Sequence, residues 1–284
     1  FKQKTAYEIY QCDWSSDVCS SDLYGDGDSE RVIGGFLGTL VDRDSLIISS
    51  KAGVSRNAER RVNNTRSSLL NDLDATLQRL GIEYLDLWQV HTWDSRTPLE
   101  ETLLALDYAV SSGRVRYVGL SNFSGWQMAR AATLQNPIFG KAPISSNQVE
   151  YSLLNRSAES EVLPAADSLG IGVLAWSPLG RGVLTGKYRL GIPADSRGAT
   201  PHFSSFVAPY LTPKSRGIID AVCVAAEGLG YSPLEVALSW VRDAPIVSSA
   251  IVGARTGAQL RGILTVEEIE LPEQVRLALD EISL

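Results

Sequence analysis

Three side chains that can exchange protons stand where a shared site could form. Lys51 ends one short apolar run, His91 ends the next such run, and Tyr24 lies upstream of both. A phenol with its ordinary pKa of about 10 needs a nearby cation to release its proton easily at neutral pH, and a buried lysine ammonium is such a cation. The three residue types together predict a proton-donating cluster.

Each residue has a simpler explanation when taken alone. A single histidine after an apolar run is more often packed or capping, and most lysines near strand ends are solvated. His91 is one of only two histidines, and no second histidine or cysteine stands at ligand spacing, so we expect no metal site. Only the pairing of Lys51 and His91 at the same end of neighbouring strands favours catalysis.

Alternating strands and helices would position these residues. Short runs rich in β-branched residues, without strict alternation, are typical of strands buried on both faces; they span 46–50, 85–90, 115–120, 144–149, 171–176 and 249–252. Between them, the segments 97–100 and 232–235 have the pattern of a capping box with proline at the first helical position. Leucines at helical spacing from Leu69 to Leu80 stop at Gly81.

This alternation predicts an α/β protein, and we interpret it as one (β/α)8 TIM barrel. An open doubly wound sheet is the alternative. However, the segment 25–30 lacks the third glycine of a dinucleotide fingerprint, and 182–188 is one residue short of a Walker loop. Barrel active sites lie at the C-terminal ends of the strands, where Lys51 and His91 fall. With six strands found, we expect the barrel to be incomplete at its N-terminus, with strand 1 missing and strand 2 corrupted.

Composition restricts the class of partner. The 284 residues carry 26 Lys and Arg against 33 Asp and Glu, a net charge of −7, which argues against nucleic-acid binding. The sequence contains no run of eighteen uncharged apolar residues, so we expect no membrane span. Three cysteines and no apolar signal core predict a reduced, cytoplasmic protein. We expect a small-molecule substrate, and the oligomeric state stays open.

Seven motifs, in order and with typical spacing, resemble the aldo-keto reductase family. They are Tyr24-Gly-Asp-Gly-Asp-Ser-Glu30, Ile48-Ser-Ser-Lys51, Leu87-Trp-Gln-Val-His91, Gly119-Leu-Ser-Asn-Phe123, Asn147-Gln-Val-Glu-Tyr151, Ala175-Trp-Ser-Pro-Leu-Gly180 and Val252-Gly-Ala-Arg255. The resemblance is greatest to the bacterial branch that is similar to potassium-channel β subunits.

The resemblance implies an oxidoreductase that reversibly reduces aldehydes or ketones to alcohols with a nicotinamide cofactor. Tyr24 would be the general acid that protonates the developing alkoxide. Lys51 would lower the pKa of that phenol, and His91 would hydrogen-bond and orient the carbonyl oxygen.

The resemblance also implies the cofactor contacts. Ser121, Asn122 and Gln148 match the residues that hold the nicotinamide amide, and Trp176 matches the aromatic ring that stacks on it. The remaining matches are Ser177, Pro178, Leu179, Gly180, Gly182 and Lys187 along the pyrophosphate, and Gly253, Arg255 and Gln259 at the adenosine phosphate. Arg255 suits a 2′-phosphate fork, which favours NADP (NADPH) over NAD. Trp176 as barrel filling and Arg255 as a surface ion pair are the alternatives.

Aromatic residues after strands predict the substrate wall. Trp93, Trp126 and Tyr151 are the candidates, since such loops commonly line apolar pockets. They favour an apolar or aromatic aldehyde or ketone.

The N-terminal region departs from the family pattern. Residues 13–22 read as the translation of a common short-read sequencing adapter, and Cys19 stands where the family has its catalytic Asp. We therefore divide the chain into an aberrant segment, 1–23, and a reductase barrel domain, 24–284. We expect the parent protein to be a reductase and this chain, as a fragment, to be poorly active or inactive. The alternatives are a non-catalytic NADPH-binding regulatory subunit and a lyase using Glu150 near Lys51.

Overall fold

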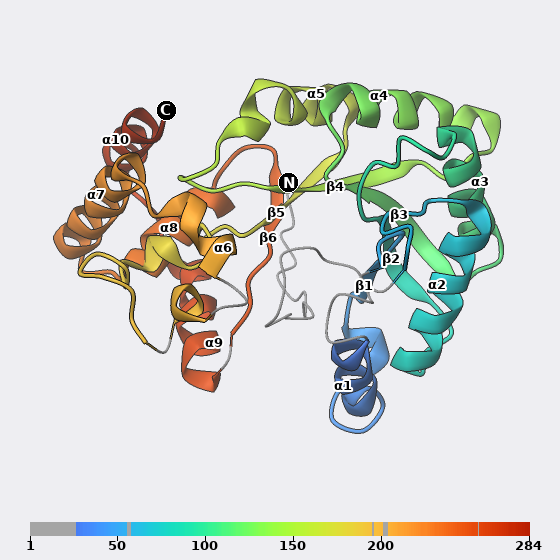
Figure 1. Cartoon of the computed structure of the whole chain (residues 1–284), viewed down its shortest axis with the longest axis horizontal. Helices are drawn as coiled ribbons and strands as arrows, with labels where there is room; N and C mark the ends of the chain where they lie inside the picture. Colours follow the sequence, from blue (N-terminus) through green and yellow to red (C-terminus); the bar gives the residue numbers. More distant parts are fainter. Residues whose placement is uncertain (1–26, 56–57, 195, 201–203, 255) are drawn as a thin grey trace. The chain divides into compact units, whose positions relative to one another are not determined.

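Six strands form one sheet in the order of the chain. The computed structural model describes residues 27–55, 58–194, 196–200, 204–254 and 256–284. The strands are β1 (Ser49–Ala52), β2 (Leu85–Val90), β3 (Val115–Ser121), β4 (Ile144–Glu150), β5 (Gly172–Trp176) and β6 (Val247–Ala250). The first three neighbouring pairs, from β1 to β4, are parallel. All six predicted strands are thereby confirmed, and Figure 1 labels them.

The strand order confirms the predicted fold class. Helices separate successive strands, and the sheet follows chain order without the reversal that marks a doubly wound sheet. This is the α/β arrangement of a (β/α)8 barrel. The expected loss of strand 1 and corruption of strand 2 concern a segment, 1–23, that lies outside the described residues.

One strand begins later than its apolar run suggests. The run starts at residue 46, but β1 begins at Ser49, because the Ile48 N–H donates to the side-chain carboxylate of Asp86 at 2.7 Å instead of to a backbone carbonyl. Lys51 therefore lies within β1 rather than after it. The last strand, β6, is shifted the other way: it begins and ends earlier than the run 249–252.

The chain divides into two compact units. The first comprises the residues up to Gln148 together with Glu161–Val173, and the second comprises Val149–Ser160 and Leu174–Leu284. In the first unit lie α1 (Asp28–Phe36), α2 (Arg66–Leu80), α3 (Leu99–Ser111), α4 (Gly125–Leu134), α5 (Val162–Leu169) and the 3₁₀ turns Arg43–Ser45 and Pro137–Phe139.

The core of the first unit lies between its helices and strands. Leu69 and Leu73 of α2, Leu106 of α3 and Trp88 of β2 are fully buried, and α2 and α3 run alongside strands β1 to β3 (Figure 1). Burying a large apolar side chain contributes about 1.5–3 kcal/mol, so this interface is the main source of stability for the strands that carry the site.

Two of the three local helix signals behave as expected. Helix α2 ends at Gly81, whose φ of 66° is the left-handed conformation of a helix terminator. Ser232 forms both hydrogen bonds of its capping box in α8. The predicted box at 97–100 is wrong: α3 begins at Leu99 behind Pro98, with no side-chain cap. The Thr97 hydroxyl donates instead to the Asp94 carboxylate at 2.7 Å.

The second unit is mostly helical. Its helices are α6 (Ser204–Val207), α7 (Pro213–Leu229), α8 (Pro233–Arg242), α9 (Gly257–Leu264) and α10 (Glu273–Ser283), with 3₁₀ turns at Ser157–Ser160, Val183–Thr185, Arg197–Ala199, Ala208–Tyr210 and Thr265–Glu268. Leu238, Ile263 and Val266 form a buried cluster that Leu179 packs against. Within the described ranges no helix by itself could cross a bilayer; α7 and α8 reach the required length and composition only as a pair bent by 101°.

Candidate functional site

The register of two adjacent strands brings Lys51 and His91 to one edge of the sheet. Lys51 pairs with Gln89 and Ala52 with Val90, and the backbone N–H of His91 donates to the Ala52 carbonyl at 3.0 Å. Because parallel neighbours present their carboxyl ends at the same edge, the predicted proximity of the two side chains follows directly.

The Lys51 ammonium is buried and hydrogen-bonded. It is 6% exposed, and its Nζ donates to Oε1 of Gln148 at 2.9 Å. Gln148, itself buried, lies on β4, so this bond joins the first and fourth strands of the sheet. A buried cation needs a hydrogen-bond acceptor, because an unpaired buried charge is costly. The sequence predicted both residues for the site, but not their contact.

His91 is buried as a neutral imidazole. Burial first, and the positive charge of Lys51 second, hold the pKa of His91 well below its ordinary value of 6.5. Nδ1 of His91 has no hydrogen-bond partner among the described residues. A buried polar atom without a partner costs stability unless a ligand satisfies it. His91 therefore offers an unused hydrogen-bonding position beside a cation.

Asn122 connects His91 to the end of β3. Its Nδ2 donates to the His91 carbonyl and to Oγ of Ser121, each at 3.1 Å, and Ser121 Oγ donates to the Gln148 carbonyl at 3.0 Å. The backbone of Asn122 has a φ of 56°, a left-handed conformation that Asn tolerates better than most residues. Three predicted cofactor residues (Ser121, Asn122 and Gln148) thus lie together with His91 in one network.

Two of the predicted substrate residues lie together in the first unit. The indoles of Trp93 and Trp126 meet edge to face with centroids 5.4 Å apart. Phe123, which the sequence reasoning missed, packs edge to face on Trp93 at 5.5 Å. Its position in the Gly119–Phe123 motif was the available signal. Trp126 is 56% exposed, so this aromatic cluster has an accessible face.

Tyr151 belongs to the second unit and has its own partners. Its ring stacks on Trp240 at 5.3 Å, and its hydroxyl donates to Glu159 at 2.7 Å. Burial, and then the hydrogen bond to Glu159, raise the pKa of Tyr151 above its ordinary value. The assignment of Tyr151 to a substrate wall stays a prediction.

The loop after β5 contains tight backbone turns. Ser177, Gly180 and Gly182 have φ values of 52°, 53° and 85°. The N–H of Gly180 donates to the Ser177 carbonyl at 2.9 Å, and Pro178 is buried. A Cβ on Gly182 would lie 3.4 Å from Nζ of Lys187, so glycine lets that ammonium approach the backbone.

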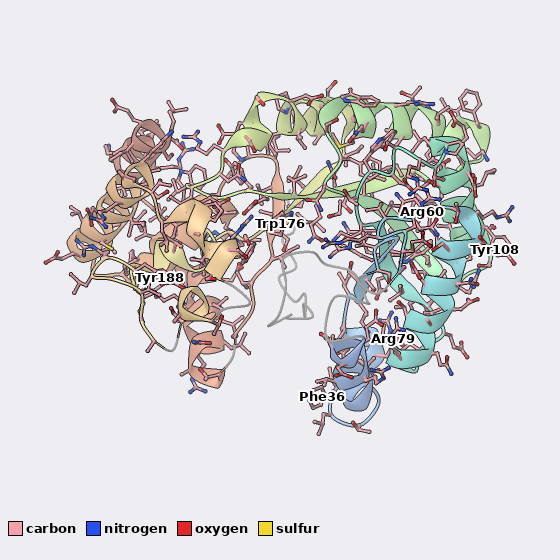
Figure 2. The ribbon with its side chains drawn as sticks, in the orientation of Figure 1. Phe36, Arg60, Arg79, Tyr108, Trp176 and Tyr188 are labelled. Carbon is pink, nitrogen blue, oxygen red and sulfur yellow. The ribbon has the colours of Figure 1, made fainter. Side chains whose placement is uncertain are left out.

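Arg181 lies in the same loop and was missed by the sequence reasoning. Its guanidinium donates to both carboxylate oxygens of Glu150, each at 3.1 Å, and to the Phe206 carbonyl at 2.7 Å. It also lies 6.0 Å from the ring centroid of Trp176, which Figure 2 labels. Tyr210 donates to Glu150 as well. Glu150 is therefore paired with a cation and a phenol in the second unit, and its role in a lyase stays a prediction.

The predicted adenosine-phosphate residues are described only in part. Gly253 and Gln259 are exposed, and the N–H of Gln259 donates to Oγ1 of Thr256 at 3.2 Å, at the start of α9. Tyr24 and Arg255 lie outside the described residues. Among the residues that are described, no group of three or more His, Cys, Asp or Glu side chains is arranged to hold a metal ion.

A sheet in chain order, with a buried lysine and histidine on adjacent strands, defines a barrel-type α/β protein with a polar site at the strand ends. The sequence model of the aldo/keto reductase family matches residues 18–284, so the chain belongs to this family.

Three relatives illustrate the range of similar proteins. An uncharacterized oxidoreductase, YrpG, of Bacillus subtilis (strain 168) is 38% identical over 212 residues, which cover 74% of this chain and 62% of that protein. A putative voltage-gated potassium channel subunit beta of Schizosaccharomyces pombe is 33% identical over 275 residues, covering 93% and 78%. L-glyceraldehyde 3-phosphate reductase of Escherichia coli (strain K12) is 37% identical over 225 residues, covering 77% and 64%. The chain thus spans less than two thirds of the first and third of these relatives.

Proposed function

We propose that this protein is an NADPH-dependent oxidoreductase that reversibly reduces aldehydes or ketones to alcohols. The observation that carries the proposal is the buried, neutral His91, whose Nδ1 has no partner in the described chain, beside the buried ammonium of Lys51. A neutral imidazole and a nearby cation suit the stabilisation of a carbonyl oxygen that gains negative charge. Family membership and the oxidoreductase relatives support the same reaction class.

The acid–base roles follow from charge and burial. Lys51 supplies a positive charge that lowers the pKa of His91, and its Nζ donates to Oε1 of Gln148. We assign Tyr24, outside the described residues, as the general acid, since a nearby cation would lower its phenol pKa. His91 orients the carbonyl oxygen by hydrogen bonding.

The nicotinamide cofactor, when bound, supplies the hydride. We assign Ser121, Asn122 and Gln148 to its amide, which fits the polar network that they form with His91. We assign Trp176, Ser177, Pro178, Leu179, Gly180, Gly182 and Lys187 to the ring and pyrophosphate, and Gly253, Arg255 and Gln259 to the adenosine phosphate, by resemblance to the family. The preference for NADPH rests on Arg255, whose guanidinium suits a 2′-phosphate.

We assign Trp93, Trp126 and Tyr151 to the wall against which the substrate lies. The exposed indole of Trp126 in the aromatic cluster supports a small carbonyl compound with an apolar or aromatic group. We also place the protein in the cytoplasm, because its three sparse cysteines fit a reducing compartment.

Absorbance at the nicotinamide band tests the proposal with a panel of aldehydes. We expect NADPH oxidation by a chain whose segment 13–22 is replaced with family sequence, and little or none by the unmodified chain. Lys51→Met should lower kcat at least about 100-fold while NADPH binding persists. Tyr24→Phe should have a similar effect, whereas the exposed Arg130→Met should leave kcat unchanged. A Lys51→Met variant with full activity contradicts the mechanism.

The pH profile provides a second test of His91. Because burial and Lys51 hold its pKa well below 6.5, the imidazole stays neutral throughout the neutral range. We therefore expect His91 to contribute no titration around pH 6.5. The pH profiles of kcat for the unmodified protein and for His91→Asn should have the same shape in that range. A difference in shape would show that His91 titrates there and would contradict the assigned neutral hydrogen-bonding role.

A non-catalytic, NADPH-binding regulatory subunit is the second candidate. It is favoured by the relative named as a channel subunit beta, whose match covers 93% of this chain, and by Cys19 at the position of the family's catalytic Asp. This alternative predicts tight NADPH binding without turnover, even after replacement of residues 13–22. We further propose that residues 13–22 are foreign to an otherwise continuous reductase domain, 24–284. Long-read sequencing of the source DNA decides this point, and an uninterrupted native copy would refute it.

A further inference from the structure

A buried carboxylate joins the two loops that follow Lys51 and His91. Asp94, after β2, is 6% exposed, and its Oδ2 accepts from Nη2 of Arg60 at 2.6 Å and from the backbone N–H of Asn64 at 2.9 Å. Arg60 and Asn64 both belong to the loop after β1, and Arg60 is labelled in Figure 2. Arg60, Asn64 and Asp94 are called the loop clamp below. None of its members was among the predicted site residues.

The loop clamp holds the residue on each side of Trp93, Thr92 by its backbone carbonyl and Asp94 by its side-chain carboxylate. Nδ2 of Asn64 donates to the carbonyl of Thr92 at 2.8 Å, and the backbone N–H of Asn64 donates to Asp94. One residue of the first loop therefore binds the neighbour before Trp93 and the neighbour after it. Sheet pairing already positions His91 through Ala52, so the contribution of the clamp begins beyond His91.

Further hydrogen bonds make the clamp rigid. Thr97 Oγ1 donates to Asp94 Oδ2 at 2.7 Å and accepts from Arg60 Nη2 at 2.6 Å. Nε of Arg60 donates to the Val62 carbonyl at 3.0 Å, so the guanidinium is held from two sides. Hydrogen bonds that involve an ionised donor or acceptor are roughly twice as strong as neutral ones. Hydrogen bonds that involve charged groups therefore fix the two loops to each other.

The aromatic cluster is the structure that depends on this placement. The ring of Trp93 contacts Phe123, in the loop between β3 and α4, and the exposed Trp126 on α4. Phe123 is buried and Trp126 is anchored at its backbone N–H by Glu161 at 2.8 Å, so both are fixed independently of the clamp. Only the Trp93 side of the cluster is positioned by Asn64 and Asp94.

We propose that the loop clamp sets the position of Trp93 and thereby selects carbonyl substrates that carry a flat aromatic group. The clamp residues are positioning residues, since they act through Trp93. This inference rests on the proposed reductase function for its substrate part. Its structural part, the placement of Trp93 against Trp126, is independent of any reaction.

The structural part is measured by circular dichroism. Two indoles with centroids 5.4 Å apart and ring planes at 63° couple excitonically and give a paired band in the ultraviolet spectrum. Trp126→Phe identifies that band by removing it. Arg60→Met should weaken the same band, and Arg60→Lys, which keeps the charge but not the fork, should weaken it less. The matched control is Arg130→Met, which breaks an exposed ion pair between α3 and α4.

The substrate part is measured by comparing benzaldehyde with propanal. In Arg60→Met we expect the KM for benzaldehyde to rise about tenfold, equivalent to about 1.4 kcal/mol, with kcat and the KM for propanal unchanged. Asp94→Asn should produce the same split. Because Arg60 is partly exposed, its variants should fold, and an unchanged far-ultraviolet helical signal verifies this.

Each outcome decides the inference. A weakened band together with a selective rise in the KM for benzaldehyde supports it. An unchanged band in both Arg60→Met and Asp94→Asn refutes the placement of Trp93 by the clamp. A weakened band with equal effects on both aldehydes refutes the role in selection. If neither the unmodified chain nor the chain whose segment 13–22 is replaced reduces either aldehyde, the proposed function fails. Quenching of tryptophan fluorescence by benzaldehyde then replaces KM, and equal quenching in Arg60→Met would refute selection.

Discussion

Removing the cation that neutralises Glu30 should destabilise the first unit strongly. Glu30 on α1 is fully buried and accepts from Nε of Arg79 at 2.5 Å, from Ser50 Oγ at 2.8 Å and from Thr76 Oγ1 at 3.1 Å. Arg79 lies in the last turn of α2 and is labelled in Figure 2. Through these contacts one carboxylate joins α1, α2 and β1, the strand that carries Lys51.

The magnitude follows from the burial of the pair. Arg79→Met leaves the Glu30 carboxylate buried with only two hydroxyl donors, and breaking a buried pair in this way costs about 3–5 kcal/mol. Replacing both charges with apolar groups, as in Glu30→Leu with Arg79→Met, should recover most of that loss, because no uncompensated charge remains. The two hydroxyls on Ser50 and Thr76 then lose an acceptor, so recovery should be incomplete.

Urea unfolding followed by far-ultraviolet circular dichroism measures the effect. With a slope of about 3 kcal/mol per molar urea, the midpoint of Arg79→Met should fall by about 1–2 M. The matched control, Arg130→Met, removes an equally charged side chain from an exposed pair with Glu100 and should shift the midpoint little. Equal shifts in the two variants would show that the burial of Glu30 has no energetic consequence and would refute the reasoning.

Three further predictions concern local structure. Gly53→Ala should lower the free energy of unfolding by at least about 2 kcal/mol, because the φ of Gly53 is 96° and a Cβ would lie 2.1 Å from Oδ1 of Asn64. Gly81→Ala, with open space around it, should lower this free energy by only about 1 kcal/mol. Equal thermal midpoints of the two variants would contradict this difference. Ser232→Ala should cost about 1 kcal/mol by removing the capping box of α8, measured as a shifted urea midpoint and restored by Ser232→Asp. Burial raises the pKa of Asp94, but its hydrogen bonds outweigh burial and hold this pKa below its ordinary value. The stability that ionised Asp94 contributes to the fold is therefore present above about pH 4 and is lost as the pH falls through the folded-state pKa. Asp94→Asn should therefore flatten the acid limb of stability against pH, and an unchanged limb would exclude Asp94 as its source.

Strand positions and the family were accessible from sequence because both depend on residues close together in the chain. Apolar runs reflect burial of whole strands, and all six appear in the sheet. The capping box of Ser232 involves atoms within one helical turn and needs no tertiary information. The motifs around Lys51, His91 and Gln148 likewise identified residues that the structure brings into one network.

The same local reasoning was wrong at Thr97. Its pattern with Pro98 and Glu100 is that of a capping box, yet its hydroxyl forms hydrogen bonds with Asp94 and Arg60 instead. The Thr97 oxygen accepts from the Arg60 guanidinium, 37 residues away, and a charged donor gives a stronger hydrogen bond than the backbone N–H of a helix cap, so this tertiary contact prevails. Arg60 lies 34 residues from Asp94, and no short-range rule includes such a pair.

The sequence by itself determined which residue types reach the end of each strand, and so the class of chemistry that we propose for this chain. Only the tertiary structure decided their partners: Lys51 binds Gln148, which is 97 residues away, and Tyr151 stacks on Trp240. Tyr24 and Arg255 lie outside the described residues and stay predictions. The physical reason is that strand and helix patterns arise from neighbours within a few residues, whereas hydrogen-bond partners in a site are chosen by the packing of the whole sheet.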